Sequence, residues 1–233
     1  MSQNQAIIFC DGASKGNPGP GGWGAVVVFS DRVAEIGGGE NATTNNRMEI
    51  TGAVSALSFA KEKNGVDVPV KIFTDSKYLI NGATSWLFNW QKNGWQTKDK
   101  RDVLNRDLWE KLSELVSDFK IKWQYVPGHS GFVLNERVDE IASSFAEGRN
   151  LELFVGALAD YSLRGEIEKA GSDVPEDIRA VKPYYISFAG GRISRHETWQ
   201  ECQSFVSGER GVRYKKVRSK AEEESAVRQW TER

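Results

Sequence analysis

Between residues 5 and 150, short apolar runs alternate with longer stretches in which apolar residues recur every three or four positions. The short runs have the length of buried strands, and the longer stretches have the period of helices that bury one face. The predicted strands are residues 6–10, 23–29, 33–37, 70–74 and 121–126. The predicted helices are residues 46–63, a helix from Ser76, residues 102–118 and a last helix from about Asn135.

The order of these elements indicates the fold class. Three strands in succession predict an antiparallel meander, with the glycine-rich residues 16–22 as the turn after the first strand. The later strands alternate with helices, which predicts β/α crossovers. We therefore expect an α/β domain in which a five-stranded mixed sheet is flanked by helices. Helical spacing along residues 102–118 is carried by Leu104, Leu108, Leu112 and Leu115.

The composition of the chain changes after residue 150. Residues 151–182 hold seven Asp or Glu against four Lys or Arg, and the glycine and proline of residues 171–175 interrupt any helix there. From residue 184 to residue 220 the sign reverses, with eight Lys or Arg against three Glu. We expect a domain over residues 1–150, an acidic connector over residues 151–182 and a small basic, aromatic domain over residues 183–233.

The bulk composition narrows the class of protein. Lys and Arg total 31 against 32 Asp and Glu, so the net charge by itself identifies no polyanionic partner. Cys10 and Cys202 lie far apart in the chain, and Cys10 falls in a predicted buried strand, so neither a disulfide framework nor a zinc cluster is expected. No segment approaches the roughly 18 apolar residues of a membrane span. A cytoplasmic, monomeric protein that does not engage membranes is expected.

Four carboxylates stand beside signals that could gather them in one place. Asp11 and Asp75 each follow an apolar strand run, Glu49 falls in the first turns of a predicted helix, and Asp139 falls in the last one. Clustered acids without matching cations repel one another unless a divalent cation joins them, and oxygen ligands suit Mg²⁺ or Mn²⁺. The set predicts a two-metal site for phosphate chemistry. The alternative is that the acids are solvated surface charges, the usual fate of carboxylates.

Residues 5–148 resemble the type 1 ribonuclease H family through five motifs in the family's order. These motifs are DGASKGNPGPGG at 11–22, TTNNRME at 43–49, TDS at 74–76, GHSG at 128–131 and NERVD at 135–139. The resemblance implies a ribonuclease H-like fold and an endonuclease that hydrolyses the RNA strand of RNA–DNA hybrids, leaving 5′-phosphate and 3′-hydroxyl ends.

The resemblance also assigns the catalytic groups. It implies two Mg²⁺ ions per site, for which Mn²⁺ can substitute, held by Asp11, Glu49, Asp75 and Asp139 with Asp11 shared. His129 matches the histidine that assists water positioning or product release, and its ordinary pKa range suits proton movement near neutral pH. A loop histidine without a catalytic role is the alternative.

Further positions match the family's contacts to a hybrid, which is recognised largely by the shape of its minor groove and its 2′-hydroxyls. The groove contacts implied are Ser14, Asn17, Asn45 and Asn46, and those near a DNA phosphate or sugar are Thr44 and Trp86. A cap on the Glu49 helix is the alternative role for Asn45 or Asn46. Residues 86–101 resemble the basic protrusion of many members, whose expected contacts here are Lys92, Trp95, Lys98, Lys100 and Arg101. Trp90 is expected to pack internally instead.

The C-terminal module resembles the small α+β hybrid-binding domain that eukaryotic ribonucleases H usually carry at the N-terminus, with a closing helix over residues 221–230. Trp199 and Tyr214 would supply flat surfaces for DNA sugars, and Lys215 and Lys216 would meet phosphates. Relatives of this module also tolerate double-stranded RNA. The alternative is that Trp199 and Tyr214 are core residues of a small domain.

Fold alone never secures function, so a catalytically silent protein that binds hybrids or double-stranded RNA on the same fold is the main rival. The intact set of four acids argues against it.

Overall fold

The computed structural model describes residues 5–65, 68–128, 131–171, 184–207, 211–217 and 220–231. The chain divides into two compact units, residues 1–128 with 132–173 and residues 174–233 with 129–131. Within the described residues, no helix is both long and apolar enough to cross a membrane. Cys10 and Cys202 are both buried free thiols.

The first unit is built on one mixed sheet with the strand order β5-β4-β1-β2-β3-β6. Its strands are β1 (Ala6–Ser14), β2 (Gly19–Phe29), β3 (Arg32–Thr43), β4 (Val70–Thr74), β5 (Ile121–Tyr125) and β6 (Val155–Ala157). The first three strands form the predicted antiparallel meander, and β4 and β5 run parallel to β1. The expectation of five strands was wrong because β6 pairs with the outer edge of β3.

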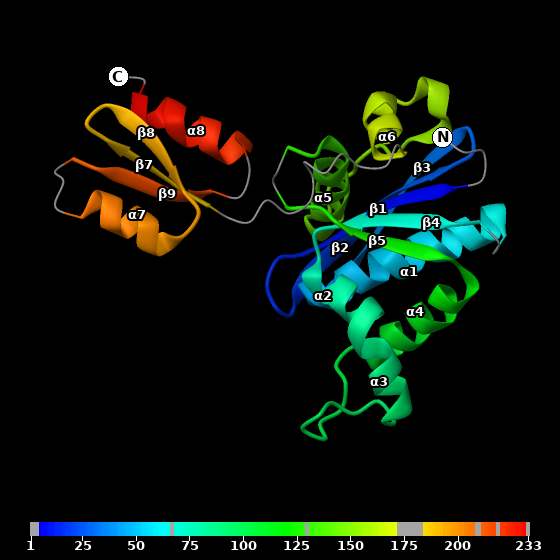
Figure 1. Cartoon of the computed structure of the whole chain (residues 1–233). Helices are drawn as coiled ribbons and strands as arrows, with labels where there is room; N and C mark the ends of the chain where they lie inside the picture. The colour runs from blue at the N-terminus through cyan, green and yellow to red at the C-terminus, as the bar shows by residue number, and fades with distance from the viewer. Residues whose placement is uncertain are drawn as a thin grey trace. The chain divides into compact units, whose positions relative to one another are not determined.

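Helices cover both faces of this sheet. They are α1 (Asn45–Asn64), α2 (Lys77–Asn81), the π-helical η1 (Gly82–Trp86), α3 (Leu87–Lys92), α4 (Arg106–Asp118), α5 (Val133–Ala146), the 3₁₀ turn η2 (Leu158–Asp160) and α6 (Arg164–Gly171). Figure 1 shows α1 and α4 on one side of the sheet and α5 and α6 on the other. Alternation along β1 divides its apolar side chains between two cores. Ile8 and Cys10 join the core under α1 and α4, whereas Phe9 stacks on Phe73 at 4.6 Å.

The predicted helix over residues 102–118 begins later than its apolar pattern suggests. Asp102 forms an isolated β-bridge, and Asn105 has a left-handed backbone with φ of 60°, so α4 starts only at Arg106. Leu104, which continues the leucine spacing, is therefore outside the helix and 79% exposed. The other three leucines of that spacing are buried. A local turn overrides the hydrophobic period here.

Part of the predicted acidic connector is folded onto the first unit. Residues 151–171 contribute β6, η2 and α6, and they bury Tyr161, Ile167 and Ala170. The apolar pattern of three residues is too short to predict β6, whose position depends on the open edge of β3. Residues 172–182 of the predicted connector lie outside the described residues, and the predicted domain boundaries stay a prediction.

The second unit is a three-stranded antiparallel sheet with two helices. Its elements are β7 (Tyr184–Ala189), β8 (Arg192–His196), α7 (Trp199–Val206), β9 (Arg213–Val217) and α8 (Lys220–Thr231), with the strand order β8-β7-β9. Helix α7 begins at a capping box between Thr198 and Glu201, as the sequence of a helix start should. A small core forms around Ile186, Val217 and Ala226. The predicted closing helix is confirmed as α8.

Candidate active site

Two of the four acids meet because their strands are neighbours. Strands β1 and β4 run parallel, and Phe9 pairs with Phe73 across them. Asp11 and Asp75 each follow their phenylalanine by two residues, so both lie at the same level along these two central strands. Asp11 is only 7% exposed, and Asp75 is half-buried.

Glu49 reaches Asp11 because Gly12 lets a helix approach the strand. A Cβ atom at Gly12 would lie 2.2 Å from the backbone nitrogen of Glu49, so only glycine allows this contact between β1 and α1. The helix is fixed in register by its cap, since the Thr44 hydroxyl accepts a hydrogen bond of 3.3 Å from the Arg47 N–H. Glu49 therefore stands beside Asp11 in the second turn of α1.

Asp139 is brought to the site by a second close contact, between α5 and β2 on the other face of the sheet. Gly24 pairs with Asp11 across β1 and β2. A Cβ atom at Gly24 would lie 2.6 Å from the carbonyl oxygen of Val138, so α5 lies directly on the strand at this point. The next residue of α5 is Asp139, which is half-buried. Gly12 thus sets α1 against β1, and Gly24 sets α5 against the neighbouring strand β2.

The charges of the four acids act on one another. The pKa of Asp11 is raised from 3.8 to about 8, first by burial and then by the negative charge of Asp75, with smaller contributions from Asp139 and Glu49. The Gly12 N–H opposes this rise by donating a 2.7 Å hydrogen bond to Asp11 Oδ1. Without a cation, the protein therefore holds Asp11 as a carboxyl group that resists ionisation.

Glu49 is perturbed in the same direction. Its pKa is raised from 4.5 to about 7, mainly by burial and in part by the charge of Asp75. Two donors oppose the shift, because the Ser76 hydroxyl donates to Glu49 Oε2 and Asn45 Nδ2 donates to Glu49 Oε1 at 2.9 Å. Both oxygens of Glu49 are thus oriented by neighbours before any ligand arrives.

These acids fit a divalent cation that binds together with a phosphate. Within the described residues, no three His, Cys, Asp or Glu side chains are grouped so that they could hold a metal ion by themselves. Mg²⁺ needs no such group, because it commonly takes one or two carboxylates and completes its shell with water and substrate phosphate oxygens. A bound cation would offset the electrostatic cost of ionising Asp11 and Glu49 and so lower their raised pKa values.

Two residues of the site were missed by the sequence analysis. Besides donating to Glu49, the Ser76 hydroxyl caps α2 by accepting a 3.0 Å hydrogen bond from the Leu79 N–H. Asn135 is 3% exposed, and its Nδ2 lies 3.5 Å from Asp75 Oδ2. A signal for Asn135 existed, because it precedes Asp139 by four positions and so shares its helix face.

The residue before the predicted catalytic histidine lies next to Asp75. Gly128 follows β5, and a Cβ atom there would lie 2.6 Å from Asp75 Oδ2. His129, the next residue, lies outside the described residues, and its role stays a prediction.

The predicted groove contacts surround the start of α1 and the turn after β1. Ser14 is half-buried at the end of β1, and Asn17, Asn45 and Asn46 are exposed. The alternative in which Asn45 or Asn46 caps α1 was wrong, because Thr44 is the N-cap. Asn46 therefore has a side chain in solvent at the entrance to the site.

The protrusion over residues 86–101 combines packed tryptophans with exposed cations. Trp90 is confirmed as an internal residue, because its ring lies 5.5 Å from both Trp86 and Trp109. Trp95 is half-buried, with the Arg106 guanidinium 5.6 Å from its ring, so its main contacts are within the protein. The exposed cations of the protrusion are Lys92, Lys98, Lys100 and Arg101.

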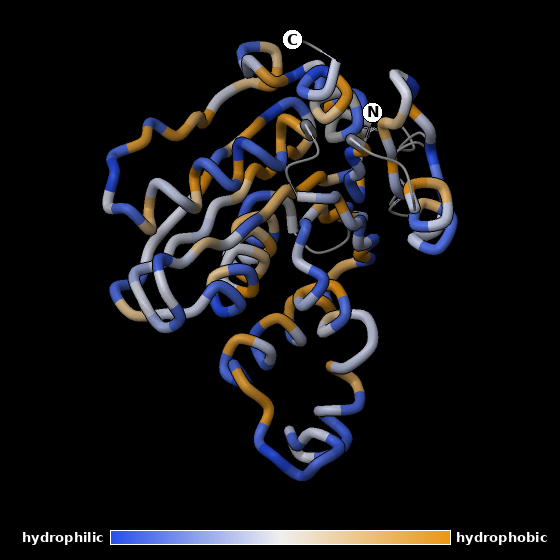
Figure 2. Tube along the Cα trace, turned by 90° about the vertical axis from the view of Figure 1, so that its left-hand side faces the viewer, coloured by the Kyte–Doolittle hydropathy of each residue, from blue (hydrophilic) through white to orange (hydrophobic). Residues whose placement is uncertain are grey.

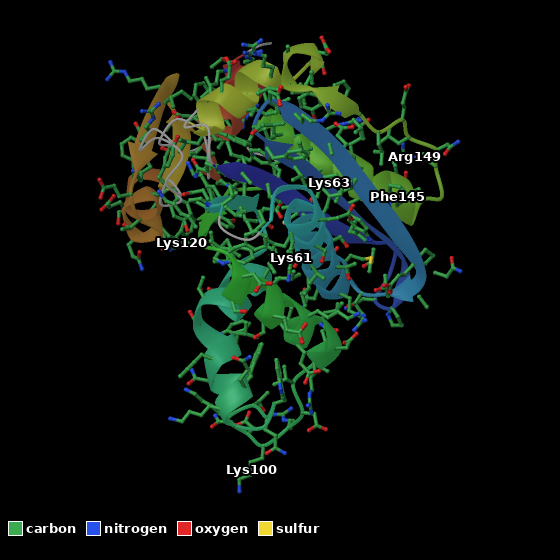
Figure 3. The ribbon with its side chains drawn as sticks, turned by 90° about the vertical axis from the view of Figure 1, so that its right-hand side faces the viewer. Lys61, Lys63, Lys100, Lys120, Phe145 and Arg149 are labelled. Carbon is green, nitrogen blue, oxygen red and sulfur yellow. The ribbon has the colours of Figure 1, made fainter. Side chains whose placement is uncertain are left out.

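The tip of the protrusion is hydrophilic. Figure 2 shows the loop that follows α3 coloured blue over most of its length, and Figure 3 shows Lys100 at its far end, pointing away from the sheet. The cations expected to meet phosphate are therefore exposed.

The second unit presents an aromatic surface on its α7 side. The Trp199 ring lies between those of Tyr185 and Tyr214, with centroids 5.4 and 5.2 Å away and the ring planes tilted, and Lys216 Nζ lies 5.7 Å from the Tyr185 ring centroid. Tyr214 is 53% exposed and is no part of the core around Ile186, so the alternative of a core role does not describe it. Alternation along β9 puts Lys215 on the opposite face of the sheet from Tyr214 and Lys216. The two lysines thus cannot share one surface with the rings.

Comparisons with known proteins agree with this geometry. The family model described as RNase H matches residues 3–147, which leaves β6, α6 and the second unit outside it. A ribonuclease H of Afipia carboxidovorans is 50% identical over 153 residues, which are 64% of this chain and all of that protein. One of Cyanothece sp. is 51% identical over 154 residues, 66% of this chain and 96% of that protein.

A solved structure shows the same fold. The crystal structure of LC9-RNase H1, described as a type 1 RNase H with the type 2 active-site motif, superposes with a TM-score of 0.59 at 27% identity. The superposition covers 74% of this chain and 83% of that one. The chain therefore belongs to the RNase H family and, with it, to the nucleases that hydrolyse phosphodiester bonds.

Proposed function

We propose that this enzyme cleaves the RNA strand of RNA–DNA hybrids with two divalent cations, leaving 5′-phosphate and 3′-hydroxyl ends. The observation that carries the proposal is that Asp11, Glu49, Asp75 and Asp139 lie close enough for their charges to act on Asp11, whose pKa is raised to about 8 by burial first and by the charges of the other three acids. Family membership supports it, because RNase H enzymes generally use divalent metal ions.

In this proposal the acids hold Mg²⁺, or Mn²⁺ in its place, with Asp11 as the shared ligand. When bound, such a pair of ions supplies an activated water and stabilises the leaving oxygen of the phosphodiester. The protein orients its ligands beforehand, since Ser76 and Asn45 fix Glu49 and Asn135 lies beside Asp75. His129 would assist water positioning or product release.

A hybrid would be recognised by its shape and its 2′-hydroxyls. The exposed amides of Asn17, Asn45 and Asn46 and the hydroxyl of Ser14 offer short polar groups around the acids, as groove contacts require. Trp86, 36% exposed, and Thr44 would lie near the DNA strand. The protrusion cations would hold phosphate without reading bases.

We further propose that the second unit binds the same class of duplex through Trp199, Tyr214 and Lys216, with double-stranded RNA as a second ligand. Their shared surface supports this role, and Lys215 would act only through a second contact on the opposite face. A tethered second module raises the effective concentration of substrate at the first. We also propose that the protein is a cytoplasmic monomer. Its two buried free thiols suit a reducing compartment. Light scattering coupled to size-exclusion chromatography would test the monomeric state.

The decisive experiment compares cleavage of end-labelled RNA–DNA hybrid, double-stranded RNA and double-stranded DNA in Mg²⁺. The wild type should cut only the RNA strand of the hybrid. A 5′-phosphate-dependent exonuclease should degrade the RNA products, which would show that they carry 5′-phosphates. Asp75→Asn should reduce the rate by about a thousandfold or more, since removing a metal ligand removes transition-state stabilisation. The matched control is Asp31→Asn, an exposed carboxylate in the turn between β2 and β3, which should cleave normally.

Other outcomes separate the alternatives. Hybrid binding without cleavage by the wild type would favour the silent binding protein, and cleavage of double-stranded RNA would change the substrate. Undiminished cleavage by Asp75→Asn would remove the site assignment. For the second unit, Trp199→Ala should weaken hybrid affinity about tenfold, the effect of one lost stacking contact, and leave the Mg²⁺ requirement unchanged.

A further inference from the structure

Residues 151–171 form a strap that crosses from the outer edge of the sheet back over its α5 face. The strap begins beside β3 through β6 and ends in α6, next to α5 (Figure 1). Two buried charged residues of the sheet fasten it. Lys71 in β4 donates a 3.1 Å hydrogen bond to the carbonyl oxygen of Ala170, and Glu35 in β3 accepts from the start of the strap.

Glu35 is a buried carboxylate with a complete set of partners. Its side chain is 1% exposed. The strap supplies the Phe154 N–H at 3.0 Å and the Tyr161 hydroxyl at 2.8 Å. Arg137 of α5 supplies the other two donors, its Nε at 2.8 Å and Nη2 at 2.7 Å, in a bidentate pair. Such a fork fixes the guanidinium in both position and plane.

Arg137 joins the strap directly as well. Its Nη2 donates to the carbonyl oxygen of Glu152 at 3.1 Å, and its Nη1 donates to Glu140 at 2.7 Å. The guanidinium is therefore held at once by β3, by the strap and by the next turn of its own helix. This is the junction of three elements that are distant in sequence.

Arg137 precedes Asp139 by two positions on α5. Two residues turn an α-helix by about 200°, so the two side chains leave opposite sides of the helix. Close approaches at Gly22 and Gly24 and a buried helix face seat α5 on the sheet. Pinning Arg137 to β3 and the strap adds a second constraint on the rotation of α5 about its axis, and with it on the direction of Asp139.

The start of α5 is packed on the side that faces the sheet, where Leu134 and Val138 are fully buried, but less tightly on the side that faces the strap. A hollow of about 680 Å³ opens between the helix and the strap, lined by Val133, Glu136, Glu140, Phe154, Ser162 and Leu163. Since the two elements are not close-packed there, the polar junction is what holds their spacing.

We propose that the strap is a positioning device for catalysis, in which Tyr161 and Glu35 act through Arg137 to aim Asp139 at the metal site. The inference rests on the proposed function, because it takes Asp139 as a metal ligand. The strap lies outside the stretch matched by the RNase H family model, whereas Glu35 and Arg137 lie inside it.

The test measures Mg²⁺ binding to the full chain by isothermal titration calorimetry, together with KM and kcat on a hybrid. Residues that orient a metal ligand change metal affinity about tenfold or more when substituted. Glu35→Gln should weaken Mg²⁺ binding by about tenfold and Tyr161→Phe by about threefold, because the second removes one of four hydrogen bonds to Glu35. KM for the hybrid should stay unchanged in both variants while kcat falls at limiting Mg²⁺.

Two controls isolate the junction from stability. Glu168→Gln removes an exposed ion pair within the strap, to Arg164, and should leave Mg²⁺ binding unchanged. Leu115→Ala destabilises the core under α4 and should lower stability without altering Mg²⁺ affinity. If it weakened Mg²⁺ binding as much as Glu35→Gln, the effect would be one of general stability and the inference would be overturned.

Asp139→Asn separates the inference from the proposal on which it rests. Unchanged Mg²⁺ binding in Asp139→Asn would show that the metal site itself is wrongly assigned. Weakened binding in Asp139→Asn, with wild-type binding in both Glu35→Gln and Tyr161→Phe, would overturn the strap inference alone.

Discussion

Replacing Asp11 by asparagine should abolish catalysis and stabilise the metal-free protein. Asparagine keeps the shape of the side chain and an oxygen that can accept the Gly12 N–H, so the perturbation is the loss of a titratable charge. In the folded protein, burial and the neighbouring Asp75 raise the pKa of Asp11 from 3.8 to about 8. The folded state therefore holds the Asp11 proton more tightly than the unfolded state does.

The sign of the pH dependence follows from that difference. Because the folded pKa lies above the unfolded one, stability from Asp11 is full below about pH 4 and is lost progressively up to about pH 8. At about 1.4 kcal/mol for each pH unit, the ceiling at pH 7 is about 4 kcal/mol. Local relaxation and water entry screen a buried charge, so we expect Asp11→Asn to gain about 2 kcal/mol.

Urea unfolding in EDTA at pH 4, 6 and 8 measures this gain, with Asp31→Asn as the control. The advantage of Asp11→Asn should be near zero at pH 4 and largest at pH 8. Adding Mg²⁺ should stabilise the wild type more than the variant, because the ion binds only the folded acid cluster. A variant no more stable than the wild type at pH 8, or an equal advantage at pH 4 and pH 8, would refute the reasoning.

Three further predictions concern how the site is held. Gly24→Ala should lower the free energy of unfolding by about 2 kcal/mol and lower activity, because the new Cβ would lie 2.6 Å from the Val138 carbonyl oxygen. Thermal unfolding measures this loss, and Gly165→Ala is the control because nothing lies within 4 Å of a Cβ there. Ser76→Ala should lower the free energy of unfolding by about 1 kcal/mol, because it removes the N-cap of α2. Since the Ser76 hydroxyl also lowers the pKa of Glu49, carbon NMR of the variant should find that pKa above about 7. Burial alone would raise the pKa of Glu35, but hydrogen bonds from Arg137, Phe154 and Tyr161 lower it below 4.5, so its stabilisation is present above that value and lost in acid. Glu35→Gln should thus cost about 3 kcal/mol at pH 7, and circular dichroism should find the cost shrinking below about pH 4.

Much of the first unit could be predicted because its signals are local. The apolar runs before Asp11 and Asp75 predicted their strands, although β1 continues past Asp11 to Ser14 because it stays paired with β2. The parallel register of β1 and β4 brings the two acids side by side. The start of α4 could not be predicted from its leucines, because the turn at Asn105 competes with the hydrophobic period. In the second unit, the sequence placed Lys215 and Lys216 together, but the pleat of β9 separates them.

The amino-acid sequence by itself determined which elements form and which chemical groups they carry, because turns, periodicity and caps act over a few residues. Only the tertiary structure decided how the acid-bearing elements meet. Gly12 and Gly24 matter for the space that they leave to α1 and α5, and the sequence cannot show what fills it. The pairing of Glu35 with Arg137 joins residues 102 positions apart, and the strap closes on them from farther along the chain. Burial and long-range charge, which raise the pKa of Asp11 and hold Arg137 in place, exist only once the chain has folded.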